Sequence, residues 1–481
     1  MIDRPAARVA ATAFGLAAAA SLGAQTFRVG PTVHVSRAGA ERAHEEVILG
    51  AHPTDPRRVL GCSIVDRDRY AAGGMHGIAY ASTDGGATWK PAAESTRLNG
   101  DPMCGYGPDG RAYFLSIGTD DESWKKAEWW MELFVSADGG ATWGKEIVSP
   151  GGDRPYLAFD DGDGATRGIG YVVYAIRAGA LDKKGPFGVP RDATVPTIEV
   201  LRSDDGWRTR TKAAVGVSLG PGFPTATGAA VLSDGSLAVL WLKRFMKRDA
   251  NGNDIGQADR QELLMSVARP RGELFGPPVK IADLVADRPA SATFFSLARD
   301  ATRGRYRDHL YAAWTDTRPP RPRILVAASS DGGKTWSPAR AVNDVPAAKS
   351  RGRLDDYMPT VAVNRDGVVA VTWKRRYRDE DDADIRLTAS RDGGATWLPS
   401  VLVAAARGEI QGGLTRVALR PTDDGATPGS RSMKLFKGGD TSGLAADAAG
   451  VFHALWADQR SGIGQVFTAT IAVGDAARGS R

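Results

Sequence analysis

The chain has 481 residues, of which 42% are hydrophobic and 25% are charged. This balance is typical of a soluble globular protein. Its formal charge of +6 is spread along the chain without a basic block, which gives no support for nucleic-acid binding. We therefore expect no nucleic-acid partner.

Residues 1–24 have the pattern of an export signal. Arg4 and Arg8 precede an alanine-rich apolar run, and small residues near its end offer cleavage sites. The alternative is a buried helix. No other stretch approaches the roughly 18 uninterrupted apolar residues of a membrane span. We expect a signal peptide at 1–24, one domain at 25–481, and a secreted or periplasmic protein without a membrane span.

Two cysteines, Cys62 and Cys104, are the whole complement of the chain. In an oxidising compartment they could form a disulfide. Sequence alone does not show whether they meet, so two buried free thiols remain an equal alternative.

An octet with the pattern Ser-x-Asp-Gly-Gly-x-Thr-Trp recurs along the chain. Four copies end at Trp89, Trp143, Trp336 and Trp397, and a degenerate copy at residues 203–209 lacks the final Trp. An Asp carboxylate followed by two glycines is typical of a tight turn. Thr and Trp then favour a strand. We therefore predict a structural role for the octet carboxylates of Asp84, Asp138, Asp205, Asp331 and Asp392.

Between the octets lies a second repeat, in which two apolar runs flank a turn. Residues 224–241, 359–373 and 440–456 are examples. Asp-Gly centres between apolar runs predict hairpins. Both repeats together give seven units of about 60 residues each.

Seven similar antiparallel units predict an all-β fold, a seven-bladed β-propeller of four-stranded blades, with six blades as the alternative. A ring leaves only short protected edges. The last unit lacks an octet, so we expect residues 31–36, the first strand after the leader, to complete the final blade.

The octet is the Asp-box, and nearly the whole chain resembles the sialidase (neuraminidase-like) and BNR-repeat propellers. The resemblance implies an exo-α-sialidase-like glycoside hydrolase. Sialidases have six blades, whereas the repeat count here favours seven. In the family the Asp-box is a structural turn, so it carries no chemistry.

The octet joins the third and fourth strands of a blade. The opposite face of the ring is then formed by residues that enter the first strand or leave the second. The residues entering first strands include Glu45, Glu46, Asp101, Asp153, Arg154, Asp355, Asp356, Tyr357 and Asp440. Those leaving second strands include Asp66, Arg67, Asp316, Arg318, Arg375, Arg376, Asp458 and Arg460. We expect these side chains at the mouth of the central channel.

The resemblance implies three arginines that bind a sugar carboxylate, a Tyr nucleophile activated by a Glu, and an Asp acid/base. The catalytic candidates are Tyr357, Asp355 and Asp153. The substrate-binding candidates are Arg28, Arg154, Arg318, Arg375, Arg460, Asp316, Asp440 and Asp458. Arg28 comes from residues 27–31, a loose match to the family's Phe/Tyr-Arg-Ile-Pro motif. In the alternative interpretation, Asp and Arg of adjacent blades pair and stabilise the ring.

No metal-ligand spacing, phosphate loop or Ser-His-Asp signature is present. We expect no cofactor and no metal, and read residues 160–163 and 249–254 as solvated turns. Two functions remain open. One is an exported hydrolase of glycans with a terminal acidic sugar. The other is a non-catalytic propeller that binds a glycan or a protein partner. With either function we expect a monomer whose ligand is a glycan or another small anionic molecule.

Overall fold

The computed structural model describes most of the chain. The described residues are 27–66, 75–95, 98–119, 129–144, 147–150, 152–176, 197–213, 223–248, 250, 254–272, 274–285, 295–319, 321–344, 354–377, 383–406, 439, 441–461 and 463–474. The predicted signal peptide lies outside them. No helix in this part of the chain has the length and hydropathy needed to cross a bilayer.

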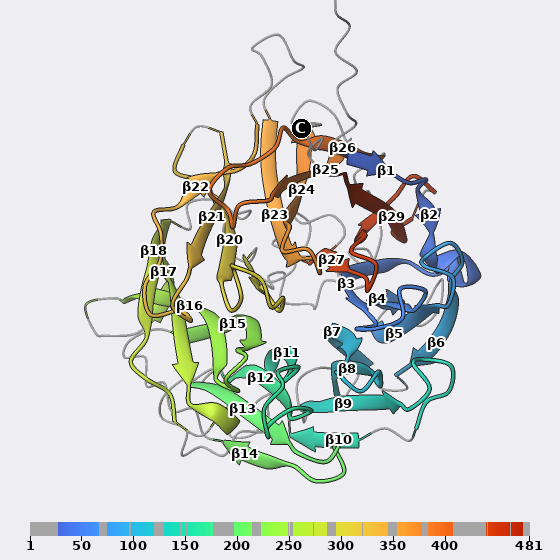
Figure 1. Cartoon of the computed structure of the whole chain (residues 1–481), viewed down its shortest axis with the longest axis horizontal. Helices are drawn as coiled ribbons and strands as arrows, with labels where there is room; N and C mark the ends of the chain where they lie inside the picture. Colours follow the sequence, from blue (N-terminus) through green and yellow to red (C-terminus); the bar gives the residue numbers. More distant parts are fainter. Residues whose placement is uncertain are drawn as a thin grey trace, which may run out of the picture.

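Seven antiparallel sheets form a ring, which confirms the predicted seven-bladed propeller (Figure 1). The blades are numbered in chain order, and the strands of each blade are given from the innermost to the outermost. Blade 1 contains β3 (His44–Ala51), β4 (Val59–Asp66), β5 (Met75–Ser82) and β6 (Lys90–Glu94). Blade 2 contains β7 (Leu98–Tyr106), β8 (Ala112–Thr119), β9 (Trp129–Ser136) and β10 (Ile147–Pro150). Blade 3 contains β11 (Asp153–Phe159), β12 (Gly170–Ile176), β13 (Thr197–Ser203) and β14 (Thr211–Ala213).

The remaining blades repeat this order. Blade 4 contains β15 (Phe223–Val231), β16 (Leu237–Arg248), β17 (Asp254–Ala268) and β18 (Val279–Val285), with the short 3-10 turn η2 (Pro270–Gly272) before β18. Blade 5 contains β19 (Phe295–Arg299), β20 (Leu310–Asp316), β21 (Arg323–Ser329) and β22 (Arg340–Ala341). Blade 6 contains β23 (Leu354–Val363), β24 (Val369–Tyr377), β25 (Ala383–Ser390) and β26 (Val401–Ala406).

Blade 7 closes the ring with strands from both ends of the chain. It contains β27 (Gly443–Ala446), β28 (Phe452–Asp458) and β29 (Gln465–Val473), and β1 (Phe27–Val29) pairs with β29 from outside. The short β2 (Val33–His34) also pairs with β29. An N-terminal strand therefore closes the last blade as predicted, but it begins at Phe27, ahead of the predicted residues 31–36. Within that range only β2 pairs, and the chain turns into the 3-10 helix η1 (Val35–Gly39) from Val35 on.

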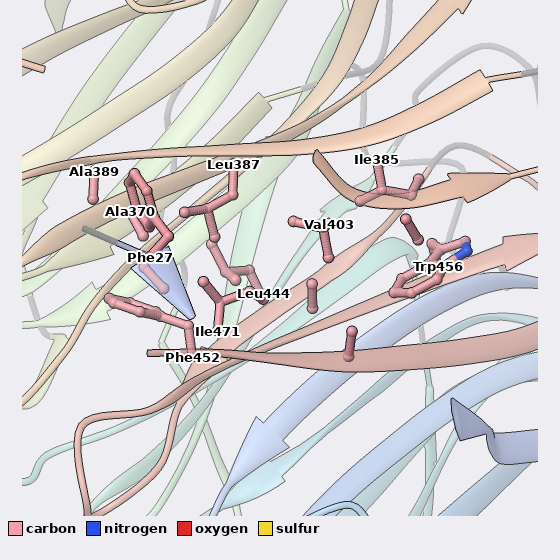
Figure 2. Close-up of a cluster of buried hydrophobic side chains, with 14 of the residues drawn as sticks. Phe27, Ala370, Ile385, Leu387, Ala389, Val403, Leu444, Phe452, Trp456 and Ile471 are labelled. Atoms are coloured by element: carbon pink, nitrogen blue, oxygen red, sulfur yellow. The ribbon is translucent and has the colours of Figure 1, made fainter. Parts of the chain in front are cut away.

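The core lies between successive blades. Figure 2 shows the cluster between blades 6 and 7, in which Phe27 of the closing strand packs with Leu387 and Ile471. Burial of one such side chain contributes roughly 1.5–3 kcal/mol to the free energy of folding. The cluster therefore stabilises the closure of the ring, where strands from both ends of the chain pair.

The octet turns are built as the sequence predicts. In the first copy, Asp84 Oδ1 accepts a hydrogen bond from Thr88 N at 2.8 Å and Asp84 Oδ2 accepts one from Thr88 Oγ1 at 2.6 Å. Gly85 and Gly86 have φ values of 73° and 87°. The same Asp-to-Thr bonds occur in the copies built on Asp138, Asp205, Asp331 and Asp392. These five carboxylates are thus occupied by their own turns.

The degenerate copy keeps this geometry with a different residue. Trp207 stands where the other copies have their second glycine, has a φ of 72°, and donates its backbone N–H to Ser203 Oγ at 2.7 Å. Its indole is buried in the core between blades 2 and 3. The buried indole offsets the strain of the left-handed backbone.

The two cysteines are free thiols, so the structure corrects the disulfide alternative. Cys62 and Cys104 are both buried in the core between blades 1 and 2. The Cys104 thiol points at the carbonyl oxygen of Ile48, 3.5 Å away. Burial raises the pKa of Cys62 well above its usual value, which favours the neutral thiol.

Candidate functional site

Four innermost strands carry the same kind of bulge near the mouth of the channel, with two residues opposite one on the neighbouring strand. The shifts lie between Glu45 and Ile48 in β3, Gly100 and Met103 in β7, Asp153 and Tyr156 in β11, and Tyr357 and Thr360 in β23. In each of these strands, the residue directly after Glu45, Gly100, Asp153 or Tyr357 has a left-handed backbone. These residues are Glu46 (φ 53°), Asp101 (46°), Arg154 (51°) and Met358 (58°).

Left-handed residues other than glycine are uncommon and cost energy, and they gather at functional sites. Proline follows three of the four, at positions 102, 155 and 359. Proline is tolerated there because a bulge does not use its backbone N–H in the ladder. The sequence therefore holds Glu46, Asp101 and Arg154 in equivalent, strained positions of three adjacent blades.

A pocket lies where these three residues meet. The pocket is small and partly open to solvent. Its lining comes from the inner strands β3, β7 and β11, which lie side by side at the centre of the ring (Figure 1), and from the segment before β27. The lining residues are Glu46, Ile48, Asp101, Pro102, Met103, Arg154, Pro155, Tyr156 and Thr441.

The polar groups of the pocket are linked across blades. The backbone N–H of Arg154 in blade 3 donates to Asp101 Oδ2 in blade 2, at 3.1 Å. An N–H donor stabilises negative charge on a carboxylate. The pocket thus combines two carboxyl groups, one guanidinium, one phenol and one hydroxyl with an apolar floor of proline, isoleucine and methionine.

A third carboxyl group, that of Glu45, is buried next to Glu46 in the sequence. Glu45, which precedes Glu46, is 9% exposed and its Oε1 has no hydrogen-bond partner among the described residues. Burial, with a smaller contribution from the negative charge of Asp66, raises the pKa of Glu45 to about 8. Glu45 therefore carries a proton at neutral pH.

The predicted arginines do not converge on the pocket. Arg318 pairs with Asp316 at 2.8 Å, and Arg460 pairs with Asp458, each two residues upstream. Arg375 is buried and donates to Asp356 Oδ1 at 2.7 Å. Arg28 lies on the outermost strand β1. These four lie apart from the pocket lining, and Arg154 is the predicted arginine that forms part of it.

Some of these pairs also join blades, as the alternative interpretation expects. Arg375 Nη2 donates to the carbonyl oxygen of Asp344, which follows blade 5, at 2.6 Å. Arg460 Nη2 donates to the carbonyl oxygen of Ala405 in blade 6 at 3.1 Å. Both arginines therefore contribute to the contacts that hold the ring together.

The predicted catalytic residues occupy a different register from the pocket residues. Tyr357 is buried and lies one position before left-handed Met358 in β23, as Asp153 does before Arg154 in β11. Asp355 pairs with Arg376 through the backbone of β23. The side chains of Asp153, Asp355 and Arg376, together with Arg67 and Asp440, lie outside the described residues.

Sequence reasoning missed several features. Tyr174 Oη donates to Glu199 Oε2 at 2.7 Å, between directly paired residues of β12 and β13. Burial raises the pKa of Tyr174. This Tyr–Glu pair is the kind that the sialidase resemblance implies, yet Tyr174 faces the core between blades 2 and 3. Tyr156 and Thr441 were also missed, although Tyr156 could have been found from its place just after Arg154-Pro155.

No cluster of three or more His, Cys, Asp or Glu side chains in the described ranges is arranged to hold a metal ion. Two carboxylates of the acidic turn at 160–163 have protein partners. Asp160 Oδ1 accepts the N–H of Gly162 at 2.8 Å, and Asp163 pairs with Arg303 at 2.8 Å. The turn at 249–254 lies largely outside the described residues.

No protein-family model matches this sequence, and no curated protein matches it. Solved structures with a similar fold include a protein of unknown function from Dyadobacter fermentans, 12% identical, with 94% of this chain and 100% of that chain covered and a TM-score of 0.43. A Hadza microbial sialidase is 13% identical, with 92% and 96% covered and a TM-score of 0.43. An α-L-arabinofuranosidase of Fusarium graminearum is 13% identical, with 72% and 92% covered and a TM-score of 0.45. The last two are glycoside hydrolases; similarity at this level does not identify an activity.

Proposed function

We propose that this chain is a glycoside hydrolase whose active site is the pocket at the channel mouth. The observation that carries the proposal is the pair of carboxyl groups of Glu46 and Asp101, held in matching strained bulges of adjacent blades and lining one pocket with Arg154. Two carboxyl groups around one glycosidic bond are the usual requirement of glycoside hydrolysis.

The two carboxyl groups take different roles. Asp101, whose Oδ2 accepts the Arg154 N–H, is the base that takes a proton from the attacking water. Glu46 donates a proton to the glycosidic oxygen. The bond from that oxygen to the anomeric carbon breaks, the water oxygen bonds to the anomeric carbon, and both carboxyl groups then exchange protons with solvent. The products are a free sugar and an alcohol.

Arg154 supports the acidic-sugar preference predicted from the sequence. A guanidinium can bind a sugar carboxylate with two parallel hydrogen bonds. The preference rests on this arginine, because it lines the pocket whereas Arg318, Arg375 and Arg460 do not. Export and a monomeric state remain predictions, which N-terminal sequencing and light scattering of the mature protein would test.

The proposal is tested with a panel of fluorogenic glycosides carrying terminal acidic or neutral sugars. We expect turnover, with Glu46→Gln and Asp101→Asn each lowering kcat/KM by about 100-fold or more. Asp163→Asn is the matched control, since Asp163 is 60% exposed in a turn on the opposite face. Arg154→Lys should raise KM for acidic sugars and leave neutral ones unchanged. No turnover of any sugar would refute the hydrolase.

The ion-paired arginines favour a second candidate, a propeller that binds a glycan without cleaving it. In that case calorimetry with intact oligosaccharides would show binding that Arg154→Lys or Asp101→Asn weakens, while the same sugars stay uncleaved. Turnover at a rate that depends on Glu46 would exclude it.

A further inference from the structure

Gly439 packs against Glu46 at a separation that leaves no room for a side chain. A Cβ atom on Gly439 would lie 2.6 Å from the backbone N and 3.0 Å from the Cα of Glu46, and would also collide with Glu46 Cγ. Gly439 has a φ of 81°. Two features therefore favour glycine at position 439: the left-handed backbone and the close contact with Glu46.

The contact involves the side chain that carries the pocket carboxylate. Glu46 Cγ leads directly to that carboxylate, and a neighbour at van der Waals distance restricts the rotamers open to it. Gly443, nearby in the same segment, is equally tight: a Cβ there would lie 2.7 Å from Leu49 Cβ and 2.9 Å from Leu49 N in β3. Between the two glycines, Thr441 lines the pocket. The segment entering blade 7 is thus seated closely on β3.

We propose that Gly439 is a positioning residue that fixes the carboxylate of Glu46 in the pocket. The inference rests on the proposed function. Its physical basis is preorganisation: a reacting group must be held within a fraction of an ångström by neighbours that cannot yield. Blade 7 supplies that neighbour, so the site depends on closure of the ring as well as on blades 1 to 3.

The test compares Gly439→Ala with Gly450→Ala. Gly450 has a φ of 88°, so Gly450→Ala carries the same left-handed backbone strain, but a Cβ there would lie 3.1 Å from Arg365 Cγ, a milder contact than at Gly439. Gly450 lies in the turn between β27 and β28, on the face away from the pocket. Both variants should lose thermal stability, Gly439→Ala more than Gly450→Ala. Gly439→Ala alone should lower kcat, by about 10- to 100-fold, with a smaller change in KM.

Two results would overturn the proposal: an unchanged kcat in Gly439→Ala, or an equal loss in Gly450→Ala. A crystal structure of Gly439→Ala separates this inference from the proposed function. We expect the Glu46 carboxylate to move while Asp101 and Arg154 stay in place, whether or not any glycoside is cleaved. An unmoved Glu46 would refute the positioning role, whereas absence of wild-type turnover would refute only the hydrolase.

Discussion

Blades 1 to 3 differ from blades 4 to 7 at one equivalent position, the fifth residue of the second strand. In the second group it is always tryptophan, namely Trp241, Trp314, Trp373 and Trp456. In the first group it is Ser63, Ser116 and Tyr174. The four indoles are at most 1% exposed. The pocket lies where the tryptophans are missing.

The position faces the preceding blade beside the channel mouth. Trp456 packs with the core between blades 6 and 7, and Trp314 with the core between blades 4 and 5. Blades 4 to 7 thus fill this position with a large apolar ring, whereas blades 1 and 2 have serine and blade 3 has tyrosine; buried charged groups occur in both sets of blades, among them Glu45 and Arg375.

The largest expected effect comes from removing an indole. Trp314→Ala deletes a fully buried side chain and should lower the free energy of unfolding by about 3–5 kcal/mol. Ser63→Ala, at the equivalent position, should change it by less than about 1 kcal/mol, because Ser63 Oγ is buried without a partner in the described structure. Urea unfolding measures both. Equal losses would contradict the distinction between the two groups of blades.

The buried carboxyl group of Glu45 makes the free energy of unfolding depend on pH. The pKa of Glu45 is about 8 in the folded protein and 4.5 ordinarily. The folded state holds this proton more tightly, so stability falls as pH rises from 4.5 to 8. Glu45→Gln removes that loss. The variant should match the wild type near pH 4 and exceed it by on the order of 2–4 kcal/mol at pH 9.

Glu41→Gln serves as the control, because Glu41 is exposed. Unfolding midpoints followed from pH 4 to 9 should show a slope that disappears in Glu45→Gln and persists in Glu41→Gln. A slope that survives in both variants would mean that another group causes the alkaline loss.

Sequence reasoning found the scaffold because each of its signals is local. The octet turn needs only its own Asp, Gly and Thr, and its spacing gives seven blades. Placing Glu46, Asp101 and Arg154 at the mouth needed only the alternation of faces around a blade. The pairing of Asp316 with Arg318 could also have been foreseen, since an Asp side chain often accepts the backbone N–H two residues on, as Asp316 does from Arg318. Cross-strand register was not available, so the Tyr174–Glu199 pair and the left-handed bulges were missed.

The smallest expected effect tests whether blades 1 to 3 differ from blades 4 to 7 only at the channel mouth. The turns of Asp84 in blade 1 and Asp331 in blade 5 have the same bonds to their threonines, 2.8–2.9 Å from N and 2.6 Å from Oγ1. Asp84→Ala and Asp331→Ala should therefore each cost about 1–2 kcal/mol and leave kcat/KM unchanged. Burial opposes ionisation of Asp331, but the hydrogen bonds from Thr335 and Ser329 outweigh it and lower the pKa of Asp331 to about 2.

That stabilisation is present above the usual pKa of 3.8 and is lost as pH falls through 2, so the difference between wild type and Asp331→Ala should shrink in acid. Thermal melts at pH 7 and pH 3 measure it. A much larger loss for one turn than for the other at pH 7 would show that the two groups of blades also differ on the octet face. Equal losses would place the whole difference at the pocket end, where the tryptophans of blades 4 to 7 are replaced by serine and tyrosine in blades 1 to 3.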